Sequence, residues 1–236
     1  MIRGCSQIQN PSREPVYLFK RLVNRGYPCP NTFTIAFVLK ACSNISAFEE
    51  GQQVHTRLLR SGFGSSLFVQ TALVNFYAKC EMIGLAKMVF DEIPERNLVA
   101  WSTMISGYAK VGLVNEALDL FREMQKMGVE PDKVTLVSVI SACAILGSLD
   151  IGRWVHAYME KQMIDTDLEL STALVNMYAK CGCIERANKV FHEMPVKDTK
   201  AWSTMIVGFA INGLSDDALE AFARMEKAKV MNDRKQ

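Results

Sequence analysis

The hexapeptide AWSTMI decides the fold of this chain, because it begins at Ala100 and returns unchanged at Ala201, 101 residues later. The same spacing carries TALVNFYAKC, which begins at Thr71, onto TALVNMYAKC, which begins at Thr172. Similarity at one fixed offset over separated segments is the sequence signature of a repeat architecture. We therefore expect an array of repeated structural units.

The clearest copy predicts two helices joined by a glycine turn. Its first helix carries apolar residues at helical spacing and is followed by Gly112, where a C-cap is expected. Its second helix has an apolar stripe formed by Ala117, Leu118, Phe121 and Met124. Gly128 and then Pro131-Asp132 end the unit, because proline cannot continue a helix and aspartate caps the next one. One hairpin cannot bury both of its faces, so neighbouring hairpins must stack.

This pattern divides the chain into repeats of 35, 31 and 35 residues, twice over. The predicted repeats are 32–66, 67–97, 98–132, 133–167, 168–198 and 199–233. Residues 1–31 are interpreted as a truncated copy of the 98–132 type, and 234–236 as a tail. The predicted fold is all-α, built from stacked antiparallel helix hairpins.

Composition limits the classes of protein and partner. A net charge of +2 is too small for a basic field over the whole molecule, so nucleic-acid contacts would depend on locally placed Lys and Arg. Seven scattered cysteines fit a reducing compartment better than a disulfide framework. We find no apolar run long enough to cross a bilayer, so no membrane partner is expected. The residues from Met1 resemble the middle of a repeat helix, and we expect the chain to be part of a longer protein.

The sequence carries no constellation of residues that indicates catalysis. The Cys-Gly-Cys at 181–183 does not have the CxxC spacing of a metal site. His192-Glu193 lacks the middle residue of a deaminase HxE motif, and no PCxxC follows it. His55 and His156 share one repeat position, where a structural or surface role is expected. We therefore predict no enzyme activity, no metal, no cofactor and no small-molecule substrate.

In this register the sequence resembles plant pentatricopeptide-repeat proteins of the class that alternates standard, long and short motifs. The resemblance covers residues 1–233 and is carried by VLKAC (38–42), GQQVH (51–55), LVNFYAKC (73–80), VFDEIPERN (89–97), WSTMISGYAKVG (101–112) and EALDLFREMQKMGVEPD (116–132). Tetratricopeptide repeats are the nearest alternative, but their W-x2-L-G-x2-Y pattern is absent and the 35/31/35 alternation does not suit them.

The resemblance implies a right-handed superhelical solenoid whose first helices line a concave groove. Each repeat of such an array recognises one base of single-stranded RNA. It also implies a place in an organellar RNA editing or processing factor, in the mitochondrion or chloroplast, together with other proteins of that machinery. A helical protein–protein interaction scaffold is the alternative, because the ends of an uncapped array expose apolar surface.

The resemblance further implies that base choice lies at the fifth and last residues of each repeat. The predicted pairs are Thr71 with Asn97, Ser102 with Asp132, Thr172 with Asp198, and Ser203 with Asp233. An ionised Asp only accepts hydrogen bonds and matches the donor edge of guanine, whereas Asn both donates and accepts and can match adenine. The expected recognition is A, G, an unread base, G and G, from 5′ to 3′.

The two long repeats have poorer pairs for hydrogen bonding to a base. The repeat 32–66 offers Ala36 with Ser66, and the repeat 133–167 offers Val137 with Asp167. The unread base of the expected recognition faces the second of these repeats.

The resemblance assigns an apolar wedge between bases to the second residue of each repeat. The expected wedges are Phe33, Phe68, Val99 and Val134, and Glu169 and Lys200 depart from this pattern. The thirteenth position holds Lys79, Lys110 and Lys180, which we expect to contact phosphates; a merely solvated face is the alternative.

The large aromatic residues of the first helices have two readings, base platform or core. At their repeat positions Trp101, Trp202, Tyr77, Tyr108 and Tyr178 are expected to pack between hairpins.

Overall fold

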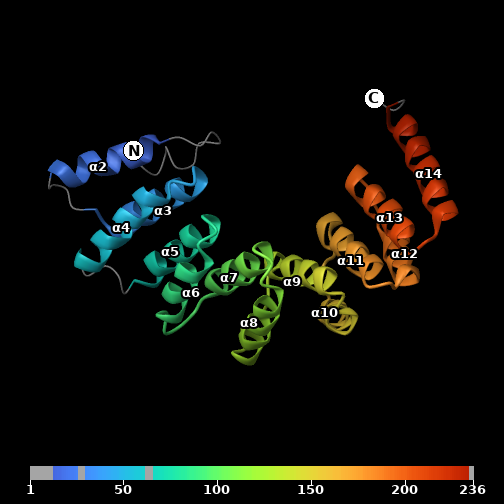
Figure 1. The fold of residues 1–236 in the computed structure, drawn as a ribbon, viewed down its shortest axis with the longest axis horizontal. Helices are drawn as coiled ribbons and strands as arrows, with labels where there is room; N and C mark the ends of the chain where they lie inside the picture. Colours follow the sequence, from blue (N-terminus) through green and yellow to red (C-terminus); the bar gives the residue numbers. More distant parts are fainter. Residues whose placement is uncertain (1–12, 26–29, 62–65, 234–236) are drawn as a thin grey trace. The chain divides into compact units, whose positions relative to one another are not determined.

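A computed structural model of the chain describes residues 13–25, 30–61 and 66–233 (Figure 1). Within these ranges every regular element is an α-helix, which confirms the predicted all-α class. The helices are α2 (Glu14–Arg25), α3 (Thr32–Asn44), α4 (Phe48–Ser61), α5 (Leu67–Lys79), α6 (Ile83–Asp91), α7 (Leu98–Lys110), α8 (Val114–Lys126), α9 (Lys133–Leu146), α10 (Leu149–Lys161), α11 (Leu168–Lys180), α12 (Ile184–Glu193), α13 (Thr199–Ile211) and α14 (Ser215–Asp233).

From residue 32 onward, each predicted repeat contains one helical hairpin. The first helix of each hairpin begins at the first residue of its repeat, so the last residue of the preceding repeat is the N-cap. The side chains of Asn97, Asp132, Asp167 and Asp198 each accept a hydrogen bond from a backbone N–H of the helix that follows. This bond satisfies one of the amides that a helix start leaves without an intrahelical partner.

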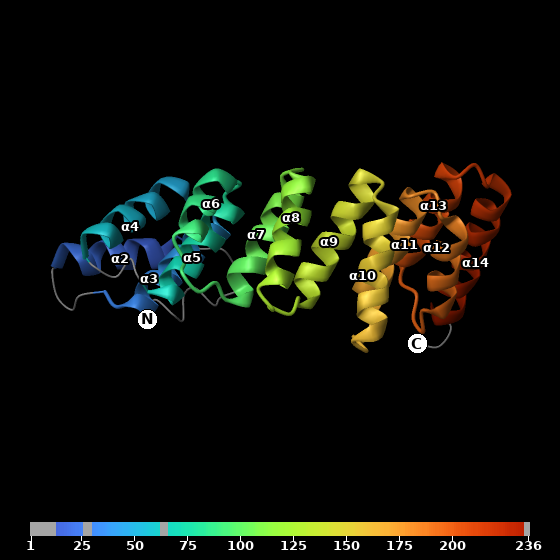
Figure 2. The ribbon, with the colours of Figure 1, turned by 90° about the horizontal axis from the view of Figure 1, so that it is seen from below.

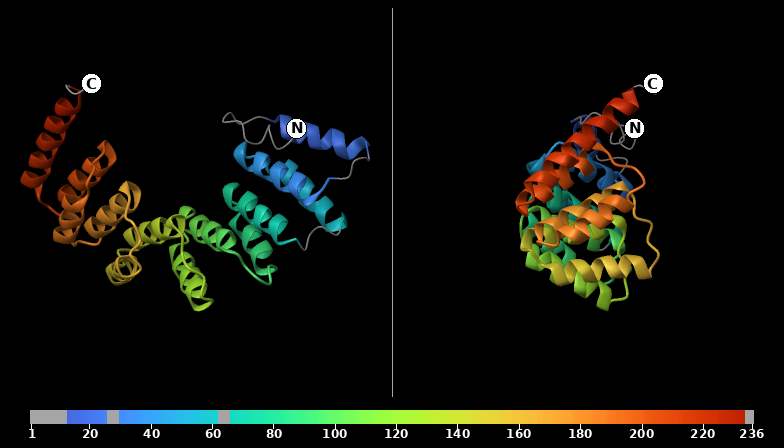
Figure 3. Two further views of the ribbon diagram at one scale, coloured as in Figure 1. Left: turned by 180° about the vertical axis from the view of Figure 1, so that it is seen from behind. Right: turned by 90° about the vertical axis from the view of Figure 1, so that its right-hand side faces the viewer.

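The chain separates into two compact units, Met1–Pro131 and Asp132–Gln236. In the first unit α5 packs between α3 and α7, and Figure 2 shows α5 paired with α6 and α7 paired with α8. In the second unit α11 packs between α9 and α13, and Figure 3 shows this row from behind, in yellow to orange. Within each unit the first helices of successive hairpins are therefore direct neighbours.

Apolar side chains fill the space between helices, as the hairpin pattern predicts. Trp101 is 1% exposed and meets the Phe90 ring edge-on, with ring centroids 5.1 Å apart. The expected stripe of the second helix is buried at all four positions, Ala117, Leu118, Phe121 and Met124. The core placement expected for the aromatic residues of the first helices is confirmed for Trp101, Tyr77, Tyr108 and Tyr178, whereas Trp202 is only half-buried.

The hairpin of repeat 98–132 turns at the expected glycine. Gly112 adopts a left-handed φ of 82°, and the next residue, Leu113, donates its N–H to the carbonyl of Tyr108 at 2.9 Å. At the equivalent turn of the hairpin before it, a non-glycine residue, Glu81, takes a φ of 62°. The equivalent residue of the second unit is Gly182, with a φ of 75°.

The last helix is longer than its counterpart in the first unit. Helix α8 ends at Lys126, whereas α14 continues to Asp233. After α8, Gly128 and Pro131 stop the chain from continuing as a helix. The residues 101 positions later are Lys229 and Asn232. Lys229 lacks the conformational freedom of glycine, and Asn232 can donate a backbone N–H within a helix, which proline cannot. The helix therefore continues through the predicted exit turn.

Candidate functional site

The fifth residues of the repeats occupy equivalent positions on first helices that are neighbours within each unit. In the first unit Thr71 is on α5 and Ser102 is on α7, and these two helices pack together. In the second unit Thr172 is on α11 and Ser203 is on α13, which also pack together. Each unit thus brings two of the predicted base-recognising hydroxyls to one row of helices.

The fifth and last residues of one repeat meet directly in the first unit. Asn97 donates a hydrogen bond from Nδ2 to Oγ1 of Thr71 at 3.3 Å. The two residues are separated by 26 positions in the chain, and the hairpin between them returns the N-cap of α7 to the middle of α5. This contact brings the two predicted recognition residues of repeat 67–97 together, with Thr71 buried and Asn97 half-buried.

Each of the four hydroxyls already has a hydrogen-bond acceptor inside its own helix. The Oγ atoms of Thr71, Ser102, Thr172 and Ser203 donate to the backbone carbonyl four residues earlier, at 2.8, 2.9, 2.6 and 2.7 Å respectively. The first three side chains are buried, and Ser203 is exposed. A hydroxyl that uses its hydrogen in this way retains lone pairs, so it faces a ligand chiefly as an acceptor.

The last residues combine helix capping with an available polar atom. Asn97 accepts from the N–H of Ala100 at 2.9 Å through Oδ1, and Asp198 accepts from Ala201 at 2.7 Å through the same atom. Asp132 uses Oδ1 for both the N–H and the hydroxyl of Thr135. The second carboxylate oxygens of Asp132 and Asp198 have no hydrogen-bond partner among the described residues and can accept from outside. The side chain of Asp233 lies outside the described residues.

The expected wedge residues are exposed apolar side chains. Their exposed fractions are 61% for Phe33, 48% for Phe68, 51% for Val99 and 55% for Val134. The first two contact one another across α3 and α5, with ring centroids 5.3 Å apart. Within the first unit, Phe33, Phe68 and Val99 lie on the neighbouring helices α3, α5 and α7, and such exposed large apolar groups are the kind of surface that marks a binding site.

The three lysines of the thirteenth position are exposed and stand in the last turn of α5, α7 and α11. Lys110 pairs with Glu81 at 3.1 Å. A cation in the last turn also interacts favourably with the helix dipole, so the position of Lys79, Lys110 and Lys180 suits a structural role as well as a phosphate contact.

An ion cluster at the start of α9 and α11 was not foreseen from the sequence. The ammonium group of Lys133 pairs with the carboxylate of Asp167 and, at 2.8 Å, with that of Glu169. The hydrogen bond from Lys133 lowers the pKa of Asp167, and the bond to Asp167 raises the pKa of Lys133. The partners are 34 and 36 residues apart in sequence, and only the packing of α9 on α11 shows that they meet.

The two equivalent histidines each join a second helix to the first helix of the next hairpin. His55 Nδ1 lies 2.7 Å from the hydroxyl of Tyr77, and His156 Nδ1 lies 2.9 Å from that of Tyr178. Burial lowers the pKa of both imidazoles. This geometry gives them a structural role.

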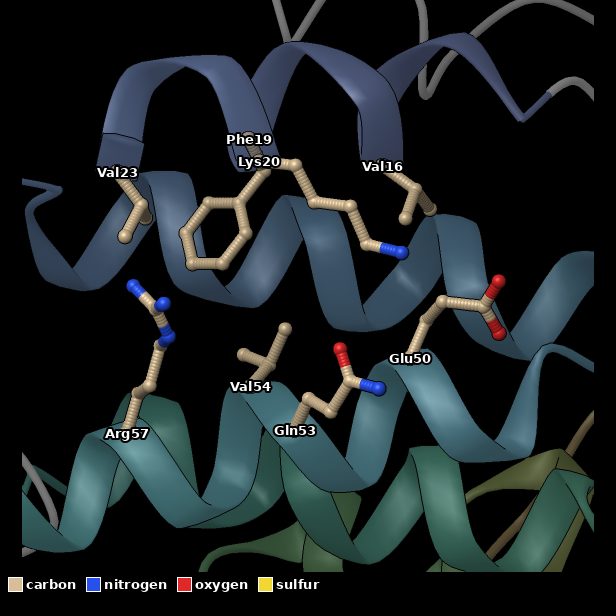
Figure 4. Close-up of a pocket in the computed structure, with 8 residues that line it drawn as sticks. All are labelled: Val16, Phe19, Lys20, Val23, Glu50, Gln53, Val54 and Arg57. Carbon is tan, nitrogen blue, oxygen red and sulfur yellow. The ribbon is translucent and has the colours of Figure 1, made fainter. Parts of the chain in front are cut away.

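Two clefts lie away from these positions. One, of about 220 Å³, opens between α2 and α4, and Figure 4 shows Lys20 and Arg57 extending into it from the two helices. The other, of about 470 Å³, is lined by residues of α12, α13 and α14, among them Trp202. Across the described part of the chain, no group of three or more potential metal ligands gathers, and no helix has the length and hydropathy to cross a membrane.

Models of known repeat families match the chain from residue 71 to residue 145 and again over most of residues 170–230. The model described as "PPR repeat family" matches residues 96–145, and the one described as "PPR repeat" matches 71–98, 170–198 and 200–230. Together these matches cover more than half of the chain.

Curated relatives from Arabidopsis thaliana extend the similarity over nearly the whole sequence. A chloroplastic/mitochondrial pentatricopeptide repeat-containing protein is 41% identical over 228 residues, which are 95% of this chain and 36% of the relative. A second pentatricopeptide repeat-containing protein, named as chloroplastic, is 43% identical over 207 residues, 88% of this chain and 34% of the relative. The chain therefore spans about a third of the length of these relatives.

Solved structures with the same fold include the protein PPR10. Its crystal structure in complex with an 18-nucleotide psaJ RNA element has a TM-score of 0.77 and 17% sequence identity, over 97% of this chain and 34% of that one. The structure of PPR10 from maize has a TM-score of 0.72 and 18% identity, over 92% of this chain and 31% of that one. This likeness shows the repeat-array fold.

Proposed function

The chain belongs to the pentatricopeptide repeat family, and from this premise we propose that it binds single-stranded RNA through the row of first helices, with one base per repeat. The observation that carries the proposal is the direct contact of Asn97 with Thr71, because it brings the two predicted recognition positions of one repeat together. The neighbouring exposed wedge residues supply apolar surface on which bases can stack.

The hydrogen-bonding atoms support a readout that differs between repeats. The free carboxylate oxygens of Asp132 and Asp198 accept only, which matches the donor groups of guanine, and the amide of Asn97 can both donate and accept, which matches adenine. The proposed target is A, G, any base, G, G from 5′ to 3′, with Asp233 at the last base. We further propose that the chain is part of an organellar factor for RNA editing or processing. The names of two relatives, which include the words chloroplastic/mitochondrial and chloroplastic, support the chloroplast or mitochondrion as its location.

The direct test compares a short RNA that contains AGNGG with a scrambled RNA of the same composition. We expect the ordered RNA to bind more tightly in fluorescence anisotropy titrations. Equal affinity for both RNAs would reject base recognition by these repeats.

A single substitution tests the assignment of one base. Asp198→Asn retains an N-cap oxygen for the N–H of Ala201 and adds a donor, so it should shift the preference from guanine toward adenine at the base facing repeat 168–198. The expected size is roughly 1–3 kcal/mol, as for a bidentate base contact. Asp132→Asn is the matched control, because it should shift the preceding guanine and leave this base unchanged.

The lysines of the thirteenth position supply the phosphate contacts in this proposal. If Lys79, Lys110 and Lys180 each neutralise one phosphate, their joint contribution to the slope of log K against log salt is roughly −2. Replacing all three with Gln should remove that part of the slope. A slope that does not change identifies them as helix-end cations without contact to RNA.

The exposed face of α14 favours the alternative of a protein-binding scaffold. Leu219 and Phe222 are 70% and 47% exposed, whereas the equivalent Leu118 and Phe121 are buried. This surface can receive a further helix of the array or a protein partner. Recovery of protein partners without RNA, in pull-downs with both the wild type and the triple lysine variant, would support the scaffold.

A further inference from the structure

The last residue of repeat 133–167, Asp167, differs from its counterparts in having both carboxylate oxygens occupied. Oδ1 accepts the backbone N–H groups of Glu169 and Leu170, both at 3.1 Å. Oδ2 is bound by the ammonium group of Lys133. In Asp132 and Asp198, by contrast, only Oδ1 has hydrogen-bond partners among the described residues.

We propose that Lys133 is a specificity-determining residue that silences Asp167, so that the base facing this repeat is left unread. The proposal rests on the proposed RNA-binding function. The Oδ2 atom of Asp167 already accepts from the ammonium group, and a guanine N–H directed at its remaining lone pair would lie beside the positive charge of Lys133. The hydrogen bond to guanine is therefore weaker than at Asp132 and Asp198, whose Oδ2 atoms carry no cation among the described residues. The central N of AGNGG then has two causes, the apolar Val137 at the fifth position and the contact of Lys133 with Asp167.

The position of Lys133 supports a surface role for this contact. The side chains of Lys133, Asp167 and Glu169 are 45%, 47% and 56% exposed. Exposed ion pairs contribute little to folding stability, so the cluster is not explained by a need to hold α9 against α11. Its position at the starts of these two helices places it beside the exposed wedge Val134.

In the first unit the three residues equivalent to this ion cluster are uncharged. The residue equivalent to Lys133 is Thr32, and those equivalent to Asp167 and Glu169 are Ser66 and Phe68. The cluster therefore consists of three charged residues, each of which replaces an uncharged one. Its wedge position carries a carboxylate bound by Lys133, where the first unit has an exposed phenyl ring.

The test is to release Asp167 with Lys133→Thr, which introduces the residue of the equivalent position. Binding is measured to four RNAs that contain AGAGG, AGCGG, AGGGG or AGUGG. Wild-type protein should bind all four within about twofold. Lys133→Thr should bind the AGGGG sequence about fivefold or more tightly than the others, the lower end of the discrimination of a bidentate base contact.

Two further variants separate silencing from loss of charge. Lys161→Thr removes one exposed lysine of the same unit, in the last turn of α10, that has no ion pair among the described residues, and it should leave the four RNAs equivalent. Lys133→Thr with Glu169→Gln removes one charge of each sign, and it should show the same guanine preference if the single variant binds too weakly to measure. Adding Asp167→Asn to Lys133→Thr should shift the preference from guanine toward adenine.

The outcomes distinguish this proposal from the function on which it rests. If both Lys133 variants bind the four RNAs equally, while Asp198→Asn still changes the preference at its own base, Lys133 does not silence Asp167 and RNA binding stands. If no variant and no RNA shows any base preference, both proposals are wrong.

Discussion

The two 101-residue copies, 32–132 and 133–233, build the same hairpins with different chemistry at equivalent positions. In the first copy the guanidinium of Arg96 lies 4.5 Å from the centre of the Phe90 ring and 5.4 Å from that of Trp101. It also donates to Glu123 at 3.4 Å. One planar cation therefore covers two aromatic rings and joins consecutive hairpins of the first unit.

In the second copy a lysine takes the place of that arginine. The ammonium group of Lys197 lies 5.3 Å from the centre of the Phe191 ring and donates to the carbonyl of Met194 at 2.7 Å. Arg224 stands where the first copy has Glu123, and the cleft of about 470 Å³ lies beside Trp202. The two copies thus keep a tryptophan at this position, but different residues cover it. The tryptophan should therefore contribute more to the free energy of unfolding in the first copy than in the second.

The largest expected effect comes from removing the two tryptophans one at a time. Trp101→Ala should lower the free energy of unfolding by roughly 3–5 kcal/mol, because it leaves a cavity in a fully buried site. Trp202→Ala should cost at least about 1 kcal/mol less, since its ring is only half-buried. Urea denaturation followed by circular dichroism measures both, and equal losses would contradict this difference between the copies.

Each copy has a glycine against which a side chain of the neighbouring helix packs closely. A Cβ at Gly51 would lie 2.1 Å from the Phe76 ring, and one at Gly152 would lie 2.4 Å from the sulfur of Met177. A rigid ring cannot move aside as a flexible thioether can. Gly51→Ala should therefore destabilise by about 1–3 kcal/mol. Gly152→Ala should cost less, because a gain of up to about 1 kcal/mol in helix propensity offsets the smaller clash.

The melting temperatures of these two alanine variants provide the measurement. A Gly152→Ala variant that melts lower than Gly51→Ala would show that Met177 is held as firmly as Phe76, and would reverse the comparison.

The two copies also differ at one turn residue, and the expected effect on the free energy of unfolding is smaller. Glu81 has a φ of 62° where the second copy has Gly182. The left-handed conformation costs a non-glycine residue about 1–2 kcal/mol, and part of the gain from glycine is lost to its greater freedom in the unfolded chain. Glu81→Gly should raise the free energy of unfolding by about 0.5–1 kcal/mol, and Gly182→Ala should lower it by a similar amount. The same denaturation curves measure this pair, and a destabilised Glu81→Gly would show that the ion pair with Lys110 outweighs the strain.

The smallest expected effect is a dependence of stability on pH through His55 and His156. Burial lowers the pKa of both below the ordinary value of 6.5, so the unfolded chain binds protons first as the pH falls. Their contribution to stability is complete above pH 6.5 and is lost as the pH falls through the lowered pKa values. Replacing both with Gln should reduce the fall in urea midpoint between pH 7.5 and pH 5. An unchanged fall would assign the acid sensitivity to other groups.

Most of the helix pattern could be predicted from the sequence, because local signals determine it. The N-caps Asn97 and Asp198 and the turn residue Gly112 act on the few residues beside them, so they fix where helices begin and end. The 101-residue offset then transfers each boundary from one copy to the other. The all-α class was predicted on this basis and is confirmed.

The contacts between hairpins could not be predicted in the same way. The pairing of Lys133 with Asp167 joins residues 34 positions apart, and the ring contact of Phe33 with Phe68 joins residues 35 apart. Such pairs depend on how neighbouring helices rotate and approach, which no local pattern encodes. The positions of the recognition residues were chosen by resemblance, and their role in binding RNA stays a prediction.

If the chain binds RNA as proposed, the N-caps limit which substitutions can change its base preference. Because Asn97 and Asp198 hold a helix start with one oxygen, any new residue there must satisfy the helix before it can satisfy a base. The residues that cap well are few, and losing a cap costs about 1 kcal/mol. In the proposed function, a change of target by mutation is thus restricted to exchanges such as Asp for Asn, which alter the proposed base contact and keep the helix cap.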